Sequence, residues 1–328
     1  MIATSPGAAC IGLCTLLVAC SLAAWPARSQ TPYPSQTIKL MVPNAPGGLP
    51  DTVARIVGRR LQERLDQSVV VENRPGANGR VAVTALLSSP ADGYTFIVTD
   101  GAILSINPLL YANLNYDPRD VLPIAMLARA PLFLAVHAKV PAATLSEFIA
   151  YVRARPGQIN YGSSGVGSTH HLSMEAMNAS LKLAMVHVPF KGTGESVPAL
   201  LGGHIDVLFS AYPSLSGAAD GKQIKLLATN GAQRSAQAPD LPSLAEFIPG
   251  FDFSPVIGIF GRTGTPFMVV QKLVAEALAV IKEPDVVRRL AAVGVEPAGA
   301  GPDDFALVLQ AEIRRAAQAV QAAGIQAK

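Results

Sequence analysis

Short apolar runs alternate with helical patterns in the first third of the chain. Residues 38–42 and 94–99 are apolar runs of strand length, and a third run at 69–72 ends at a Pro-Gly turn. Apolar residues recur every three or four positions over 52–65, as they do in a helix, and 81–87 favours a second helix. This βαβαβ order predicts an α/β fold with a mostly parallel sheet and a ligand beyond the carboxyl ends of the strands.

A second α/β segment follows a Pro/Asn-rich passage at 107–123. The apolar run at 124–136, broken by Arg129 and Pro131, is longer than a typical strand of one sheet, so we expect it to pass from one domain into another. The alternation then resumes, with strands expected at 159–161, 184–188, 205–209, 224–228 and 256–260, and helices near 145–153, from 169, and at 196–201, 268–281, 285–292 and 302–322.

A chain that leaves one α/β domain and later returns to it predicts a hinged clamshell with a cleft between two sets of strand ends. We expect domain I to comprise 30–124 and 231–328, and domain II to comprise 125–230. The return crossing has an alternative place near 255–262, and one large α/β domain is the alternative architecture.

The composition excludes one class of partner. Half of the 328 residues are hydrophobic, only 15% are charged, and the formal net charge is +3. This length supports a large core and about two domains. Since Lys and Arg are not clustered, we expect no nucleic-acid binding.

The N-terminal segment predicts export. Residues 8–24 are apolar and lack charged side chains, which is typical of a secretory signal with cleavage after Ser29. Removing the signal peptide 1–29 takes away Arg28 alone and lowers the charge from +3 to +2. The alternative is a lipoprotein signal at 1–19, because residues 17–20 resemble a lipobox that would make Cys20 a lipidated N-terminus.

The three cysteines, Cys10, Cys14 and Cys20, all lie in this leader. Either cleavage leaves no cysteine pair in the mature chain, which excludes structural disulfides and cysteine-based catalysis or metal binding.

Two glycine-containing loops each follow a strand and open a helix. The loop at 43–51 directs backbone N–H groups at whatever lies above it, and a helix N-terminus with bare amides binds anions. The loop at 161–171 adds hydroxyl donors that suit a carboxylate. Capping offers another role for Asp51 in the first loop, and for Ser168 or Thr169 in the second.

Enzyme motifs do not fit the second loop. It contains neither G-x-S-x-G nor G-x-G-x-x-G, and residues 191–193 reverse the order of a P-loop. His170 and His171 are adjacent, so they point apart on a helix. We expect neither an enzyme nor a bound metal or cofactor.

The chain resembles the Bug (Bordetella uptake gene) family, periplasmic substrate-binding proteins of tripartite tricarboxylate transporters. The resemblance runs from Tyr33 to the C-terminus. It rests on residues 42–43, 45–48 and 51, on 71–77, 91–95, 160–165 and 187–192, on 200–203 and 206, and on 264–266. It implies a two-lobed α/β periplasmic-binding-protein fold (Venus flytrap, type II) with a hinge and an inter-domain cleft. It also implies a periplasmic monomer that captures a small organic carboxylate and delivers it to membrane subunits.

In such proteins two loops close on opposite sides of the ligand, and main-chain amides and ordered waters hold one carboxylate. The ligand-binding residues that the resemblance implies are Pro46, Gly47, Gly48, Asp51, Thr99, Asp100, Ser163, Ser164, Gly167, Ser168, Lys191 and Ser210. Asn44 stands where an aromatic residue is common, and Ser210-Ala211 where Asp-Asn is frequent, so the identity of the acid does not carry over.

Two alternatives remain at this stage. A receptor that acts on a sensor kinase would have the same fold and cleft. A secreted α/β hydrolase would need a nucleophile and a base, and the sequence shows no such pair.

Overall fold

The computed structural model describes residues 1–2, 32–44 and 46–326. Cleavage after Ser29 and lipidation of Cys20 therefore fall outside the described residues. The chain forms two units, Met1–Ser35 and Gln36–Lys328, and everything below concerns the second. In the described part of the chain, no helix has both the length and the apolar character needed to cross a membrane.

Six strands form the first sheet, sheet A, in the order β11-β4-β10-β3-β1-β2. Its strands are β1 (Ile38–Val42), β2 (Val69–Asn73), β3 (Thr95–Asp100), β4 (Val121–Arg129), β10 (Val256–Arg262) and β11 (Glu296–Ala300). β1 pairs in parallel with β2 and β3, whereas β10 lies between β3 and β4 and is antiparallel to both.

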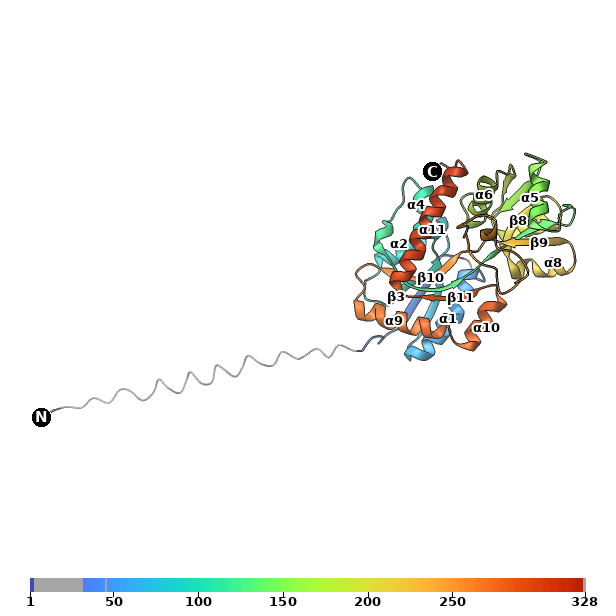
Figure 1. The fold of residues 1–328 in the computed structure, drawn as a ribbon. Helices are drawn as coiled ribbons and strands as arrows, with labels where there is room; N and C mark the ends of the chain where they lie inside the picture. The colour runs from blue at the N-terminus through green and yellow to red at the C-terminus, as the bar shows by residue number, and fades with distance from the viewer. Residues whose placement is uncertain (3–31, 45, 327–328) are drawn as a thin grey trace. The chain divides into compact units, whose positions relative to one another are not determined.

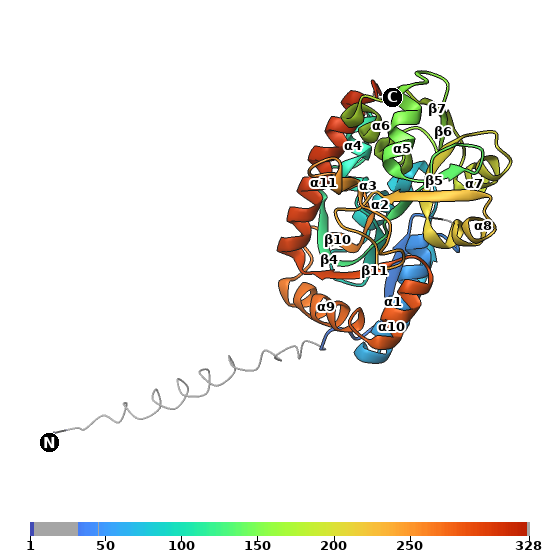
Figure 2. The same cartoon turned by 45° about the vertical axis from the view of Figure 1, so that its right-hand side comes forward.

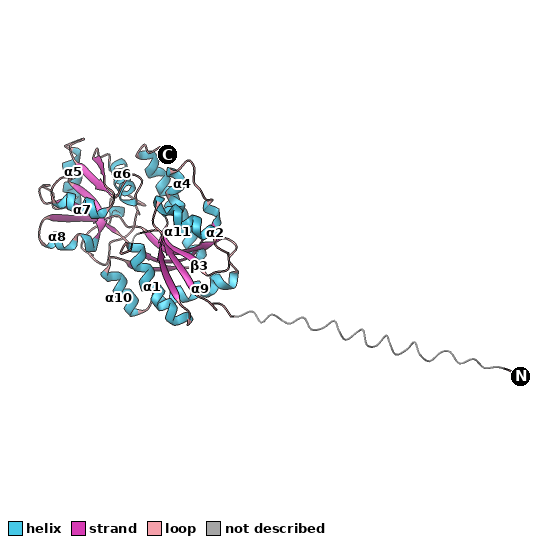
Figure 3. Cartoon of the chain, turned by 180° about the vertical axis from the view of Figure 1, so that it is seen from behind, coloured by secondary structure: helices cyan, strands magenta, loops and turns pink. Residues whose placement is uncertain are grey.

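The second sheet, sheet B, has five strands in the order β7-β6-β8-β5-β9. Its strands are β5 (Leu132–His137), β6 (Asn160–Ser163), β7 (Val186–Pro189), β8 (Val207–Ala211) and β9 (Ile224–Thr229). β6 is parallel to β7 and β8, and β5 is antiparallel to β8 and β9. The prediction of mostly parallel sheets is therefore wrong, since both sheets are mixed. Figure 3 shows the strands as two separate groups flanked by helices.

The helices cover both sheets (Figure 1). Sheet A with its helices is called lobe I, and sheet B with its helices lobe II. The helices of lobe I are α1 (Leu49–Leu65), α2 (Arg80–Ser88), α3 (Ala102–Ser105), α4 (Asn107–Leu110), α9 (Phe267–Val280), α10 (Pro284–Ala292) and α11 (Pro302–Ala322). Those of lobe II are α5 (Leu145–Arg153), α6 (Thr169–Leu181), α7 (Thr193–Leu201) and α8 (Ser216–Asp220). Short 3-10 turns lie at Ala77–Gly79, Pro118–Asp120, Tyr212–Ser214 and Leu244–Glu246.

Each lobe has its own apolar core. Met41, Ile97 and Phe260 of sheet A pack against Phe305 of α11. In lobe II, side chains from sheet B and from α5 and α6 form the corresponding cluster, which includes Leu134, Phe148, Tyr161, Met174 and Phe209. These side chains lose nearly all contact with water, which makes burial the main force that orders each lobe.

The apolar run at 124–136 forms two strands in different sheets. β4 ends at Arg129 in sheet A and β5 begins at Leu132 in sheet B, so the expected continuous strand is interrupted at Ala130-Pro131. Pro131 has no N–H to donate to a ladder. The chain returns from β9 to β10 through residues 230–255, and the two crossings are tied together. Ala130 N donates to the Pro255 carbonyl at 2.9 Å, and Leu132 N donates to Asn230 Oδ1 at 2.8 Å.

Helix α11 is a third link between the lobes. It packs against β4 and α3 of lobe I and against α6 of lobe II. Leu110, Leu172, Ala316 and Val320 lie in the apolar cluster at this contact. Figure 2 shows α11 running along the first lobe towards α6. The two lobes therefore share an apolar contact in addition to the two crossing segments.

Candidate functional site

A cleft of about 650 Å³ lies where strand ends of both sheets face each other. Lobe I contributes Pro43, Asn44, Leu49, Pro50, residues 75–79, Thr99, Asp100, Ala102, Ile103, Ile106 and Asn107. Lobe II contributes Ser164, residues 166–170, Gly192, Thr193 and Ala211. β5 adds Leu132, the return crossing adds Pro255, and β10 adds Ile257.

The lining combines apolar with neutral polar side chains and is nearly free of charge. Among the lining residues that the structure describes there is no Lys or Arg, and Asp100 is the one carboxylic acid. The other polar side chains are Asn44, Asn78, Thr99, Asn107, Ser164, Ser168, Thr169, His170 and Thr193. A ligand anion in this cleft would be held by neutral hydrogen-bond donors and helix N-termini rather than by an ion pair.

The loop between β6 and α6, residues 164–168, forms the lobe II wall of the cleft. Ser168 is the N-cap of α6: its Oγ accepts from His171 N at 3.2 Å and donates to the Gly165 carbonyl at 2.7 Å. Gly167 has φ +79°, a conformation that favours glycine. Three predicted ligand residues lie in this segment, and all three, Ser164, Gly167 and Ser168, line the cleft. A fourth, Ser163, is the last residue of β6 and does not line it.

Ser163 faces the interior of lobe II. Its Oγ lies 2.7 Å from His187 Nε2, and the His187 ring stacks against those of Tyr161 and His171. His171 in turn accepts a hydrogen bond at Nδ1 from Gly167 N at 3.1 Å. Burial, reinforced by the neighbouring His187, lowers the pKa of His171 to about 4. The neutral stack of Tyr161, His187 and His171 supports the 164–168 loop through the hydrogen bond from Gly167 N to His171.

In the first glycine loop, the residues that line the cleft differ from those predicted to bind the ligand. Pro46, Gly47, Gly48 and Asp51 are absent from the lining, whereas Pro43, Asn44, Leu49 and Pro50 belong to it. The N-cap of α1 is Gly48, and Asp51 is a buried acid in the first turn.

Asp51 binds the loop rather than facing the cleft. Its Oδ2 accepts from Gly47 N at 2.9 Å and from Arg55 Nε at 3.0 Å, and its Oδ1 accepts from Asn73 Nδ2 at 2.8 Å. Burial opposes ionisation of this carboxyl, but the hydrogen bonds from Arg55, Gly47 and Asn73 outweigh burial and hold its pKa below the usual range.

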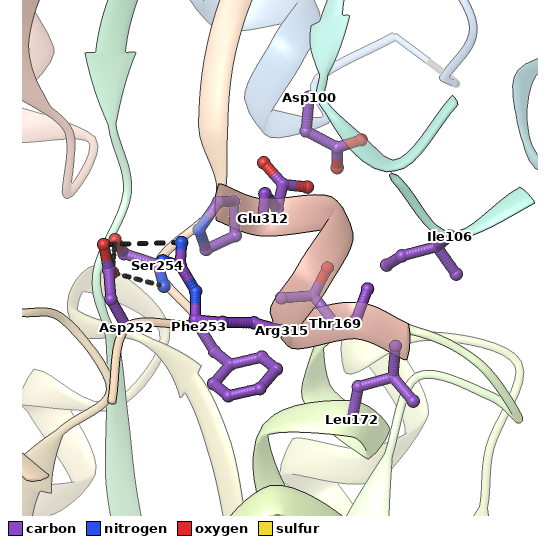
Figure 4. A pocket seen from close by; sticks show the side chains of 11 residues that line it. Asp100, Ile106, Thr169, Leu172, Asp252, Phe253, Ser254, Glu312 and Arg315 are labelled. Carbon is purple, nitrogen blue, oxygen red and sulfur yellow. Dashed lines mark hydrogen bonds and ion pairs between the residues drawn. The ribbon is translucent and has the colours of Figure 1, made fainter. Parts of the chain in front are cut away.

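Thr99 and Asp100, at the end of β3, both line the cleft, and their contact with a ligand stays a prediction. Asp100 also lines a smaller cavity of about 20 Å³ behind the cleft, together with side chains of α6, α11 and the return crossing (Figure 4). Burial raises the pKa of the Asp100 carboxyl, partly offset by a hydrogen bond from Ala102 N at 3.1 Å.

Glu312 of α11 faces Asp100 across this small cavity (Figure 4). Burial raises the pKa of Glu312 to about 7. The hydrogen bond from Ser105 Oγ at 2.6 Å opposes that shift, and the nearby Asp100 adds to it. On the other side, Arg129 and Arg315 form ion pairs with Asp252 at 3.1 and 3.7 Å. These charges join β4, the return crossing and α11 beneath the cleft.

Residues 75–79 after β2 line the cleft and were not predicted as site residues. Asn78 has φ +51°, and its carbonyl accepts from Asn107 Nδ2 at 2.8 Å, while its own Nδ2 donates to the Tyr111 hydroxyl at 2.8 Å. The signal was present in the sequence, since Pro75-Gly76 directly follows a strand whose carboxyl end meets the same sheet edge as β1.

The last two predicted residues do not line the cleft, although their neighbours Gly192 and Ala211 do. Lys191 is exposed, and its backbone N–H donates to Glu195 at 3.1 Å. Ser210 is buried, and its Oγ has no hydrogen-bond partner among the described residues. Also within the described residues, no group of three His, Cys, Asp or Glu side chains is placed to hold a metal ion.

Two mixed α/β lobes, two crossing segments and a cleft at the strand ends define the class of periplasmic solute-binding proteins. The chain belongs to the family described as the tripartite tricarboxylate transporter family receptor, whose model matches residues 53–325. The resemblance to Bug proteins and the expected two-lobed fold are thereby confirmed.

Individual relatives agree with this assignment. Protein BugT of Bordetella pertussis is 32% identical over 299 residues, which cover 90% of this chain and 92% of BugT. Among solved structures, Rpa4515 of R. palustris with adipate is 32% identical with a TM-score of 0.79, covering 90% of this chain and all (100%) of that one. MatC of Rhodopseudomonas palustris with bound malate is 31% identical with a TM-score of 0.70, covering 88% of this chain and 100% of MatC.

The family is one of solute-binding receptors rather than enzymes, as the sequence predicted, and its solved members include a periplasmic binding protein, BugD, and a solute-binding protein from Polaromonas.

Proposed function

We propose that this protein captures a small organic carboxylate in the 650 Å³ cleft and delivers it to the membrane subunits of a tripartite tricarboxylate transporter. The observation that carries the proposal is the cleft itself, which lies between the two lobes and places neutral hydrogen-bond donors among apolar side chains. Such a lining suits an acid group that needs several donors and no counter-charge.

The N-terminus of α6 is the proposed binding point for one carboxylate. Thr169 and His170 are the first two residues of that helix, and among the described residues no acceptor meets their backbone N–H groups. Bare amides at a helix start favour an anion through both hydrogen bonding and the helix dipole. Two relatives with known ligands, the adipate and malate complexes, support an organic acid as the solute.

The proposed ligand contacts combine predicted and newly found residues. From lobe II they are Ser164, Gly167, Ser168, Thr169 and His170, and from lobe I they are Asn78, Thr99 and Asp100. Pro46, Gly47, Gly48 and Asp51 act by shaping the loop that carries Asn44, and Ser163, Lys191 and Ser210 act by supporting the opposite wall.

The two lobes are proposed to act as the domains predicted from the sequence, with the chain crossing at Ala130-Pro131 and again within 230–255. Solute binding would shift the population from the open to the closed form, because a solute that touches both lobes binds the closed form better. The mature protein would work as a monomer in the periplasm after export.

A thermal-shift panel tests the proposal. The mature chain is heated with succinate, malate, adipate, citrate, aspartate and benzoate, with glucose as a neutral control. An acid at 100 times its Kd should stabilise the folded protein by about 2.7 kcal/mol. If none of the acids raises the melting temperature, carboxylate capture is wrong.

Delivery needs a separate test. The receptor is added to vesicles that hold the membrane subunits of a tripartite tricarboxylate transporter, and uptake of the stabilising acid is measured. Uptake that proceeds equally without the receptor would contradict the transport role.

A further inference from the structure

The side chains of Ser164 and His170 form a pair on the lobe II wall of the cleft. Ser164 Oγ lies 2.8 Å from His170 Nδ1, and both residues line the cleft. Because Nδ1 of His170 is hydrogen-bonded to Ser164, Nε2 is the ring nitrogen left for a ligand. Among the described residues, Nε2 of His170 has no hydrogen-bond partner.

The pair favours one tautomer of the ring. In the described part of the chain, His170 is the one hydrogen-bond partner of Ser164 Oγ. If the hydroxyl donates to Nδ1, its own proton is satisfied and the ring must carry its hydrogen on Nε2. If Nδ1 donated instead, the serine proton would have no acceptor within the protein. The first arrangement leaves Nε2 as an N–H donor.

The surroundings of His170 keep its ring neutral. Burial lowers the pKa of His170 to about 4. His170 is also the second residue of α6, where the positive end of the helix dipole opposes a second positive charge. His171 follows His170 on the same helix, and Asp100 lines the lobe I side of the cleft. Burial is the one cause of the lowered pKa of His170, and neither His171 nor Asp100 contributes to it.

We propose that His170 is a ligand-specificity residue, fixed by Ser164 as a neutral Nε2–H donor to an oxygen of the bound acid. This rests on the proposed function and deepens it, since the protein offers only hydrogen-bond donors at this end of the cleft and the ligand must supply the acceptor. A carboxylate or carbonyl oxygen fits there, and an ammonium group does not, because a donor would face Nε2–H and the bare amides of α6.

Two substitutions separate the two ring nitrogens. Gln places an amide nitrogen near the position of Nε2, and Asn places its amide near the position of Nδ1. His170→Gln should therefore keep the donor to the ligand and bind within about threefold of wild type. His170→Asn should keep the contact to Ser164 and lose the donor, which raises Kd about tenfold or more, the loss of one hydrogen bond to a charged group.

Binding is measured by calorimetric titration with succinate, malate and adipate, on variants whose melting temperatures lie within a few degrees of wild type. The matched controls are the same two substitutions at His204, which is exposed and outside the cleft lining, and these should leave Kd unchanged. A Kd that is unchanged in His170→Asn but raised in His170→Gln would overturn the proposal.

The tautomer is read separately from ¹⁵N-labelled histidine by long-range ¹H–¹⁵N correlation on the wild-type protein without ligand. We expect a hydrogen on Nε2 and none on Nδ1. The opposite pattern would overturn the proposal even if binding is intact, and would leave carboxylate capture standing. If wild-type protein binds none of the three acids or the other panel acids, the proposed function fails and this role of His170 fails with it.

Discussion

The backbone N–H of Gly47 donates to Asp51 Oδ2 over 2.9 Å, which ties the first glycine loop to the helix that follows it. Asp51 is 2% exposed, and Asn73 and Arg55 also donate to its carboxylate. The carboxylate therefore acts as a buried junction between the loop, α1 and the end of β2. The loop presents Asn44 and Pro50 to the cleft because this junction fixes its path.

Asp51→Asn tests this structural role. An amide has one acceptor oxygen where the carboxylate has two, so at least one partly buried donor loses its partner, at a cost of about 1 kcal/mol. Urea denaturation should show this loss, whereas Kd for the stabilising acid should change less than tenfold. Asp66→Asn, at the exposed end of the same helix, is the control. A large loss of affinity with unchanged stability would instead place Asp51 in direct contact with the ligand.

Gly167→Ala should disturb the contact between the two lobes. A methyl group at Gly167 would lie 2.2 Å from Leu110 Cδ1, and Leu110 is packed in the cluster that joins α4, α6 and α11. Strain at positive φ adds roughly 1 kcal/mol. We expect weaker acid binding, about tenfold or more, measured by calorimetry.

Gly157→Ala separates strain from collision. Gly157 has φ +73° and is exposed, and no atom lies within 4 Å of the position of its added methyl group. This variant should lose stability through backbone strain, and its Kd for the acid should stay unchanged. Equal affinities for the two variants would show that the Gly167–Leu110 approach has no part in binding.

Glu312→Gln should make the stability of the protein less sensitive to a rise in pH from about 4.5 to about 7. The folded pKa of Glu312 is about 7, above the value near 4.5 expected in the unfolded chain, so the folded state binds more protons between these values. Its contribution to stability is therefore lost as pH rises from about 4.5 to about 7. Relative to wild type, Glu312→Gln should gain about 1–3 kcal/mol at pH 8 and little at pH 4.5.

Urea denaturation at the two pH values measures this gain, and Asp304→Asn, an exposed neutralisation on the same helix, should show none. A Glu312→Gln protein that is less stable than wild type at pH 8 would mean that the carboxylate, rather than the acid, is the stabilising form.

His171→Asn should reduce the sensitivity to acid. The folded pKa of His171 is about 4, below the unfolded value near 6.5, so the unfolded chain binds more protons in this window. Stability from His171 is present above about pH 6.5 and is lost as pH falls towards 4. Asn keeps an acceptor for Gly167 N but does not titrate. The difference in unfolding free energy between pH 7.5 and 5 should shrink by about 2 kcal/mol, and an unchanged difference would contradict the assignment.

Most elements of the fold follow from local pattern. The expected helix at 52–65 is α1, and the strands at 38–42, 69–72 and 94–99 are β1, β2 and β3. Local pattern does not predict how β10 pairs, because its antiparallel position between β3 and β4 depends on where the returning chain enters sheet A. β11 was missed because Glu-Pro-Ala-Gly-Ala has no apolar run and its pairing with β4 is irregular.

The site was predictable at the level of loops rather than side chains. Strand alternation sends Ser163 into lobe II while Ser164 reaches the cleft, and a glycine-rich sequence does not reveal that difference. The sequence indicates only that His170 and His171 point apart on a helix. The hydrogen bond between His170 and Ser164 depends on the path of the loop, which the sequence does not reveal. Glu312 lies in the last helix, so only tertiary packing brings it to Asp100.

The most direct test is a crystal structure of the mature protein grown with the acid that gives the largest thermal shift. We predict one carboxylate at the start of α6, within hydrogen-bond distance of Ser164, Thr169 or His170, with the rest of the molecule reaching Asn78 or Thr99 of lobe I. An acid bound outside the cleft, or an empty cleft at saturating acid, would contradict capture between the two lobes.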